Sequence, residues 1–181
     1  MSARHESAAA LLRERGADDV AHPGGTLLAH LVRVHDRLLG LCGDEVLAVA
    51  GLTHAVYGTD GFGTSLLSLD ERHVLAQAVG TEVEELVYLY GAYDRDGSWS
   101  GLRQSAGAVR DRWTGDVLHP PLRDLARFVD LSTVNELDVM EQAPELRALH
   151  GPALLALFRT WRGLGSDRVL AEAEKVLAVG T

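Results

Sequence analysis

Two histidines on consecutive predicted helices are the side chains of this sequence best suited to chemistry. His30 lies in TLLAHLVRVHDRLL, three residues after Leu27 and four before Val34, and so on the apolar side of its helix. His54 lies near the end of the apolar run in AGLTHAVYG. The unperturbed pKa of an imidazole lies near neutrality, so inward-facing rings can exchange protons with a substrate. We therefore predict His54 as a general acid or base and His30 as its catalytic partner.

Each of these histidines also has a purely structural interpretation. A buried imidazole needs hydrogen-bond partners, because each missing one costs about 1–3 kcal/mol. A histidine on an apolar face is therefore more often a satisfied core residue than a functional one. Gly51, one turn before His54, either leaves room for a ligand or lets another helix approach closely. The sequence leaves both alternatives open.

Polar residues near the two histidines in the chain, or interrupting a later apolar pattern, are candidates for holding a substrate. Three of them follow His54 in the glycine-rich segment YGTDGFG, which could equally be a simple helix-ending turn. One precedes Pro-Gly-Gly just before the helix of His30, and one interrupts the apolar pattern of a long later helix. The predicted substrate-binding residues are His22, Tyr57, Thr59, Asp60 and Asn135.

The remaining titratable candidates are assigned no role. His35-Asp36 is the only literal His-Asp pair, but it lies about 140° around the helix from His30 and is predicted to be a surface feature. His5 has no supporting context, and the acidic residues near Glu84 are interpreted as charges at a helix start. The single cysteine, Cys42, excludes an internal disulfide and any multi-cysteine metal site.

The elements that would position these residues are almost all helices, because a helical period of apolar residues dominates the chain. Two capping-box patterns, Ser68 to Glu71 and Thr81 to Glu84, mark helix starts. The predicted helices cover about residues 6–15, 26–42, 44–57, 68–79, 81–93, 120–142, 151–164 and 166–179. Around residues 108–118 the helical period is lost, which predicts a small β-hairpin. We expect one all-α domain over residues 1–181.

Composition limits the partners and the compartment. The chain has 26 acidic and 17 basic residues, a net charge of −9 and no run of Lys or Arg, which disfavours nucleic acid. No apolar stretch reaches the roughly 18 residues that span a bilayer, and the N-terminus lacks a signal-peptide pattern. We expect a cytoplasmic protein from a high-GC, bacterial genome. Its expected partner is a small-molecule substrate, with a homodimer left open.

The segments TLLAHLVRVHDRLL and LAVAGLTHAVYG, about 24 residues apart, resemble the HD-domain superfamily. The resemblance covers roughly residues 22–140 and implies a helical bundle. Members of that superfamily are mostly metal-dependent phosphohydrolases, with one branch of di-iron oxygenases. By this resemblance His30 matches the first histidine of the pattern and His54 matches the histidine of the His-Asp pair. The aspartate of that pair is replaced by Ala55.

This replacement weakens the metal expectation that the resemblance carries. The distant aspartate of the pattern corresponds either to Asp130 or to Asn135. With Ala55 and Asn135 in place, two imidazoles and an amide would lack the carboxylates that usually neutralise a divalent ion. We favour no cofactor, and the alternative is a mononuclear Fe, Mn or Zn site. Its ligands would be His30 and His54, with His22 or Asp130.

Three functions follow from these observations. The first is a small-molecule enzyme on a degenerate HD-type fold that uses His30 and His54 for metal-independent acid–base chemistry, as a lyase, isomerase, cyclase or hydrolase. The second is a mononuclear metal-dependent hydrolase or oxygenase. The third is a non-catalytic ligand-binding protein that kept the bundle and lost the chemistry.

Overall fold

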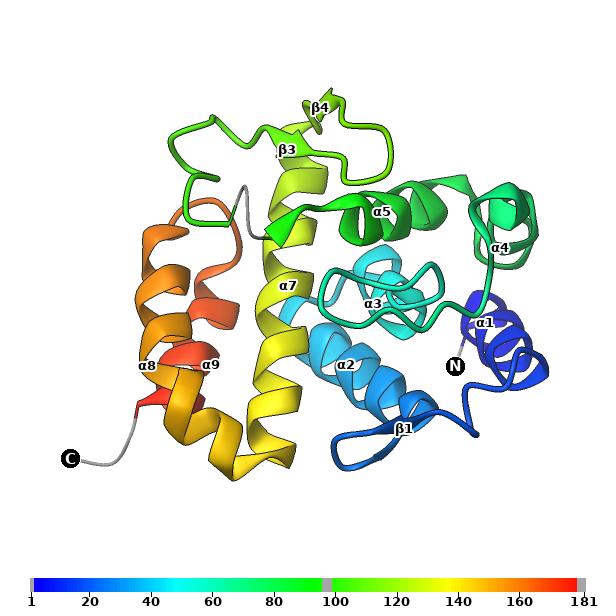
Figure 1. Cartoon of the computed structure of the whole chain (residues 1–181), viewed down its shortest axis with the longest axis horizontal. Helices are drawn as coiled ribbons and strands as arrows, with labels where there is room; N and C mark the ends of the chain where they lie inside the picture. Colours follow the sequence, from blue (N-terminus) through cyan, green and yellow to red (C-terminus); the bar gives the residue numbers. More distant parts are fainter. Residues whose placement is uncertain (1, 96–98, 179–181) are drawn as a thin grey trace. The chain divides into compact units, whose positions relative to one another are not determined.

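The computed structural model describes residues 2–95 and 99–178, and these residues form an all-α fold with two short β-hairpins (Figure 1). The chain divides into two compact units, residues 1–92 and residues 93–181. Within the described ranges, no helix is long and apolar enough to cross a membrane. The all-α prediction is confirmed.

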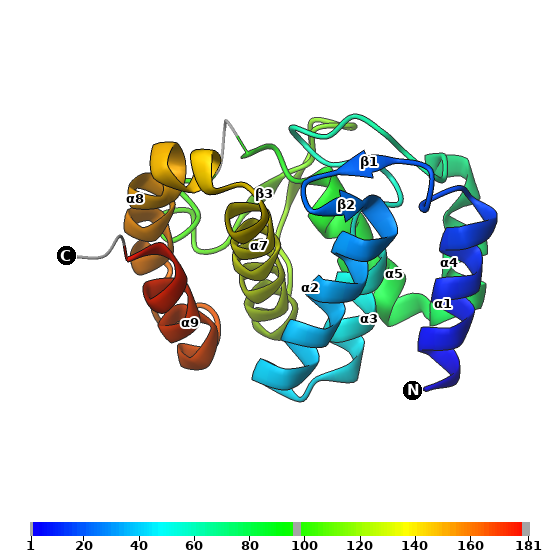
Figure 2. The same ribbon diagram turned by 90° about the horizontal axis from the view of Figure 1, so that it is seen from below.

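The first unit is built around one short, fully buried helix. Its elements are α1 (Ala3–Glu14), β1 (Ala21–His22), β2 (Gly25–Thr26), α2 (Leu27–Cys42), α3 (Glu45–Thr53), the 3-10 turn η1 (Leu69–Glu71), α4 (Arg72–Val79) and α5 (Thr81–Ala92). Every residue of α3 from Leu47 to Thr53 is buried. Helices α1, α2 and α5 pack around α3, and Figure 2 shows α2 running alongside it. The almost uniformly apolar sequence of α3 thus places it at the centre of this unit.

Side-chain caps fix where the helices of the first unit begin. The Thr26 side chain accepts a hydrogen bond from the backbone N–H of Ala29 at the start of α2, and Asp44 caps α3 in the same way. The predicted capping box of Ser68 and Glu71 is present. The predicted box at Thr81 and Glu84 is wrong, because Thr81 is already helical and the Glu84 side chain is engaged elsewhere. That engagement is part of the site described below.

At Gly51, the side chains of α2 pack closely against α3. A Cβ atom built on Gly51 would lie 2.5 Å from a terminal methyl carbon of Leu38 and 3.2 Å from a methyl carbon of Val34, both in α2. Of the two alternatives for this glycine, the structure therefore supports close helix approach. Side chains of α2 fill the space beside the Gly51 Cα atom, so this space cannot hold a ligand.

The second unit contains a β-hairpin and the long helices α7, α8 and α9. Its named elements are β3 (Val109–Arg110), β4 (Val117–Leu118), α7 (Leu122–Gln142), α8 (Pro144–Thr160) and α9 (Asp167–Leu177). The strands pair antiparallel, with Val109 opposite Leu118, so the predicted hairpin near 108–118 is confirmed. Helices α8 and α9 pack against each other and against α7 (Figure 1).

The structure differs from the predictions at several elements. The segment before α2 forms a second hairpin, β1–β2, whose turn uses Gly24 and Gly25 at positive φ. Helix α3 ends at Thr53, a turn earlier than predicted, so His54 is its C-cap. Helix α8 begins at Pro144 and carries Pro152 inside it. The predicted start near residue 151 is therefore wrong by about two turns.

Candidate functional site

Three histidines of the first unit form a row of rings that ends on a buried tyrosine. The ring centroids of His22 and His30 are 4.0 Å apart and nearly parallel, at 25°. His30 and His54 meet edge to face at 5.3 Å, and His54 meets Tyr90 edge to face at 5.1 Å. His30 and His54 are only 1% and 2% exposed, whereas His22 is half-buried. The structure thus brings together the two predicted catalytic histidines and the predicted His22.

Local backbone geometry fixes the orientation of His54. Its Nδ1 lies 2.8 Å from the carbonyl oxygen of Gly51, three residues earlier in the chain. A carbonyl can only accept, so Nδ1 carries the hydrogen and donates it. In the neutral ring the basic lone pair is therefore at Nε2. The end of α3 supplies the partner that a buried imidazole requires and at the same time selects its tautomer.

Two glycine-containing turns lie beside His22, the half-buried histidine of the row. His22 belongs to β1, and its ring meets the ring of Phe62 edge to face at 5.6 Å. Phe62 comes from the glycine-rich segment, where Thr59 and Phe62 exchange backbone hydrogen bonds and Gly61 has φ of +91°. The segment is thus a tight β-turn. Its Thr59 and Phe62 amides bond each other across the turn, so they do not form an anion-binding nest.

The predicted substrate-binding residues of this segment differ in accessibility. Thr59 is buried and Asp60 is half-buried beside it at the turn. Tyr57 is buried, and its hydroxyl donates a hydrogen bond of 3.0 Å to Glu84. Burial raises the pKa of Tyr57, and the Glu84 carboxylate raises it further. Tyr57 therefore stays protonated at neutral pH, and its hydroxyl hydrogen is already used by Glu84.

Glu84 is the buried carboxylate that sequence reasoning missed. It accepts two hydrogen bonds from the Arg72 guanidinium, at 2.6 and 2.8 Å, in addition to the one from Tyr57. Arg72 also stacks on the ring of Tyr88, with its guanidinium carbon 3.9 Å from the centroid. Glu84 is thus a junction between α4, α5 and the segment after His54. A detectable signal was present, because Arg72 and Glu84 lie on consecutive helices either side of a short turn at Gly80.

In the second unit, Asn135 belongs to a chain of polar side chains. Its amide nitrogen donates to Glu136 at 3.1 Å, and Glu136 accepts from Arg95 at 2.9 Å. One turn earlier on α7, the hydroxyl of Ser132 is buried and has no hydrogen-bond partner among the described residues. The expected contact of Asn135 with a substrate stays a prediction.

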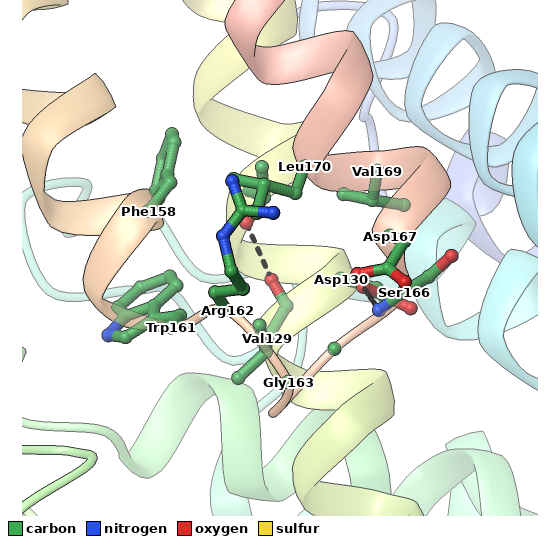
Figure 3. A pocket seen from close by; sticks show the side chains of 12 residues that line it. Val129, Asp130, Phe158, Trp161, Arg162, Gly163, Ser166, Asp167, Val169 and Leu170 are labelled. Carbon is green, nitrogen blue, oxygen red and sulfur yellow. Dashed lines mark hydrogen bonds between the residues drawn. The ribbon is translucent and has the colours of Figure 1, made fainter.

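Asp130 has a clear structural role in the second unit. Its carboxylate accepts a hydrogen bond of 2.8 Å from the backbone N–H of Ser166, the N-cap of α9 (Figure 3). A Cβ atom on Gly165 would lie 2.5 Å from the same carboxylate, so the α8–α9 connection fits tightly against α7. The cavity beside Asp130 holds about 10 Å³, about the smallest space for one water molecule. Asp130 thus anchors the connection to α9.

A second histidine group in the first unit was not anticipated. His35 is only 6% exposed, so the prediction that His35-Asp36 is a surface feature is wrong for the ring. Its Nδ1 lies 2.8 Å from a carboxylate oxygen of Asp36, and its Nε2 lies 3.1 Å from Nδ1 of His5 in α1. The apolar stripe of α2 is wide enough to include His35 between Leu31 and Leu38.

The donor set of the His22–His30–His54 cluster does not suit the metal that the HD resemblance implies. Ala55 provides no donor atom at the position of the missing aspartate. His22 and His30 stack face to face, and the lone pairs of stacked rings run parallel rather than toward one point. Across residues 2–95 and 99–178, no group of three or more His, Cys, Asp or Glu residues could hold a metal ion.

Comparison with known proteins places one family model on the chain. The model of a domain of unknown function, DUF6817, matches residues 11–95. The matched segment contains His22, His30 and His54 together with Tyr57, Arg72 and Glu84, and it excludes His5. None of the curated proteins matches the chain, and none of the solved structures does. The candidate site therefore lies wholly within the segment that this chain shares with the DUF6817 model.

Proposed function

We propose that this protein is a small-molecule enzyme on a degenerate HD-type bundle. Its active site lies in the first unit and performs acid–base chemistry without a metal. The observation that carries the proposal is the orientation of His54. Its Nδ1 donates to the Gly51 carbonyl, which puts the basic lone pair of a buried ring at Nε2. A fixed tautomer in a buried site is what a general base needs, because it selects the nitrogen that takes the proton.

His30 and His22 extend this site from the buried His54 toward the half-exposed end of the row. The rings of His30 and His54 meet edge to face at 5.3 Å, so His30 is a direct neighbour of the proposed base. The His22 ring stacks on His30 at 4.0 Å and continues the row toward β1. In the proposed reaction, His54 takes or delivers a proton and His30 assists it. Lyase, isomerase, cyclase and hydrolase reactions all use such a step.

Glu84 supports the site by bracing the segment that follows His54. Through Tyr57 it holds this segment against α5, and through Arg72 it ties the segment to α4. Neither contact requires a substrate. Tyr57 and Glu84 are therefore positioning residues in this proposal rather than groups that move protons.

A turnover screen with matched variants tests the proposal. The full chain, treated with a chelator, is incubated with mixed small polar metabolites, and products are detected by mass spectrometry. The His54→Ala variant, with an unchanged circular dichroism spectrum, should lose turnover by about 100-fold or more, the usual contribution of a general acid or base. The control is His73→Ala, which removes an exposed histidine of α4.

Three outcomes would count against the proposal. Turnover that is unchanged in His54→Ala would remove His54 from the chemistry. Turnover that disappears with chelator and returns with added Fe, Mn or Zn would favour a metal-dependent hydrolase or oxygenase. Ligand binding that survives loss of both His30 and His54, with no product formed, would favour a non-catalytic binding protein.

A further inference from the structure

The second histidine group, His5–His35–Asp36, uses none of the residues of the proposed active site. The Asp36 carboxylate can only accept, so Nδ1 of His35 carries the hydrogen of their 2.8 Å bond. The neutral His35 ring therefore presents a lone pair at Nε2. This lone pair faces Nδ1 of His5, which belongs to a different helix 30 residues earlier in the chain.

The two facing nitrogens have the spacing of neighbouring metal ligands. They are 3.1 Å apart, and the ring centroids are 4.4 Å apart with the ring planes at 66°. Two nitrogens that each lie about 2.0–2.1 Å from one ion are separated by about 3.0 Å at a right angle and about 3.4 Å at a tetrahedral angle. An ion at this bond length would lie to one side of the line between the two nitrogens and would displace the hydrogen that the two rings share. The displaced hydrogen moves to Nε2 of His5, whose ring is half-buried, so the neutral pair releases no proton.

We propose that His5 and His35 form a binding site for one divalent transition-metal ion, which bridges α1 and α2. Imidazole nitrogen is a preferred ligand of zinc, nickel and copper ions. The carboxylate of Asp36 on the far nitrogen of His35 is the outer-shell partner that orients a metal-binding histidine and raises its basicity.

The place is open to exchange with solvent. Burial and the neighbouring His35 lower the pKa of His5 and so disfavour a proton on its ring, whereas Asp36 and Glu6 act in the opposite direction. The Asp36 side chain is 69% exposed and the His5 ring is half-buried, so the group lies at the edge of the first unit. Only two protein nitrogens are supplied, so water or an external ligand completes the coordination, and the ion exchanges with solvent. Such an ion links α1, which packs on α3 and α4, directly to α2.

Metal titration of the full chain tests this proposal. Untagged protein stripped with chelator is titrated with zinc or nickel chloride by calorimetry, and its melting temperature is recorded in parallel. We expect one ion per chain and a rise in melting temperature, because an ion that binds only the native state stabilises it. Binding should weaken as the pH falls below that of neutral imidazole, because protons compete for the nitrogens.

Variants separate this site from the other histidines. His5→Ala, which alters only a half-buried ring near the N-terminus, should abolish the saturable binding and the temperature rise. Asp36→Asn should weaken binding by about 10- to 100-fold, the usual effect of losing an outer-shell partner. His54→Ala and His73→Ala should bind as the original chain does. The proposal is overturned if the original chain binds neither ion, or if binding survives His5→Ala or is lost in His54→Ala.

Discussion

The two histidine groups of the first unit solve the problem of burying imidazole rings in different ways. In the His5–His35–Asp36 group, an exposed carboxylate holds one nitrogen of the buried ring. In the His22–His30–His54 cluster, a backbone carbonyl holds Nδ1 of His54, and the next residue, Ala55, brings no carboxylate. One group is thus supported by a negative charge and the other by a dipole.

This difference separates the chemistry that each group can perform. A carboxylate partner favours the charged or metal-bound ring, because it neutralises the added positive charge. A carbonyl partner fixes the tautomer without adding a full charge, which leaves the ring able to gain and lose a proton. This difference agrees with the two proposals, which are metal binding by the group near the surface and proton transfer in the buried cluster.

Adding the missing carboxylate to the buried cluster should give the largest effect. Ala55 is 2% exposed, so Ala55→Asp would bury a charge beside His54 and should lower the free energy of unfolding by about 3–5 kcal/mol at neutral pH. The loss should shrink toward pH 4, where the buried carboxyl takes up a proton. Urea unfolding at several pH values measures it, with Ala55→Asn as the uncharged control. Equal stability of the two variants would mean that the cluster accepts a carboxylate as readily as the His5–His35 pair does.

Removing the buried carboxylate that braces the cluster should have the next largest effect. Glu84→Ala leaves the Tyr57 hydroxyl and the Arg72 guanidinium without their shared acceptor. We expect a loss of about 2–3 kcal/mol in the free energy of unfolding, at the lower end for a broken buried pair because Arg72 is 38% exposed. The neighbouring exposed Glu85→Ala is the matched control and should change stability by less than about 0.5 kcal/mol. Similar losses in both variants would show that the Glu84 contacts are not specific.

The pH dependence of stability should give the smallest effect. Burial lowers the pKa of His5, and the neighbouring His35 lowers it further, against the raising influence of Asp36 and Glu6. A folded-state pKa below the unfolded value means that, as the pH falls below 6.5, the unfolded chain takes up a proton that the native chain resists. Stability should therefore fall in this window, and less steeply in His5→Gln. Parallel curves for the two chains in metal-free buffer would contradict this assignment.

The helices were predictable wherever local signals agreed. In α2 the Thr26 cap and the apolar stripe both indicated the observed helix, and at Ser68 the capping box marked a real start. The same capping-box pattern gives a wrong prediction at Thr81, because the Glu84 side chain bonds Arg72 instead of the backbone at the helix start. A buried ion pair with Arg72 outweighed a local helix cap.

The contacts between the site residues were harder to predict than the residues themselves. His30 and His54 were identified from their position on apolar faces, and the structure brings their rings together. The contact between His5 and His35 joins two helices, so the sequence pattern of either helix alone does not predict it. His5 does share a face with the buried Ala8, Ala9 and Leu12 of α1, which was the available signal.

Gly51 limits which substitutions the packing of α2 against α3 can accept. Even a single methyl group at this position would lie 2.5 Å from a methyl carbon of Leu38 and would force the side chains of α2 to shift in the buried contact between α2 and α3. Gly40, with nothing within 4 Å of an added Cβ, carries no such constraint. In a library of single substitutions, position 51 should therefore accept little besides glycine while position 40 accepts many residues. The spacing between the rings of His30 and His54 thus depends on a residue that has no side chain.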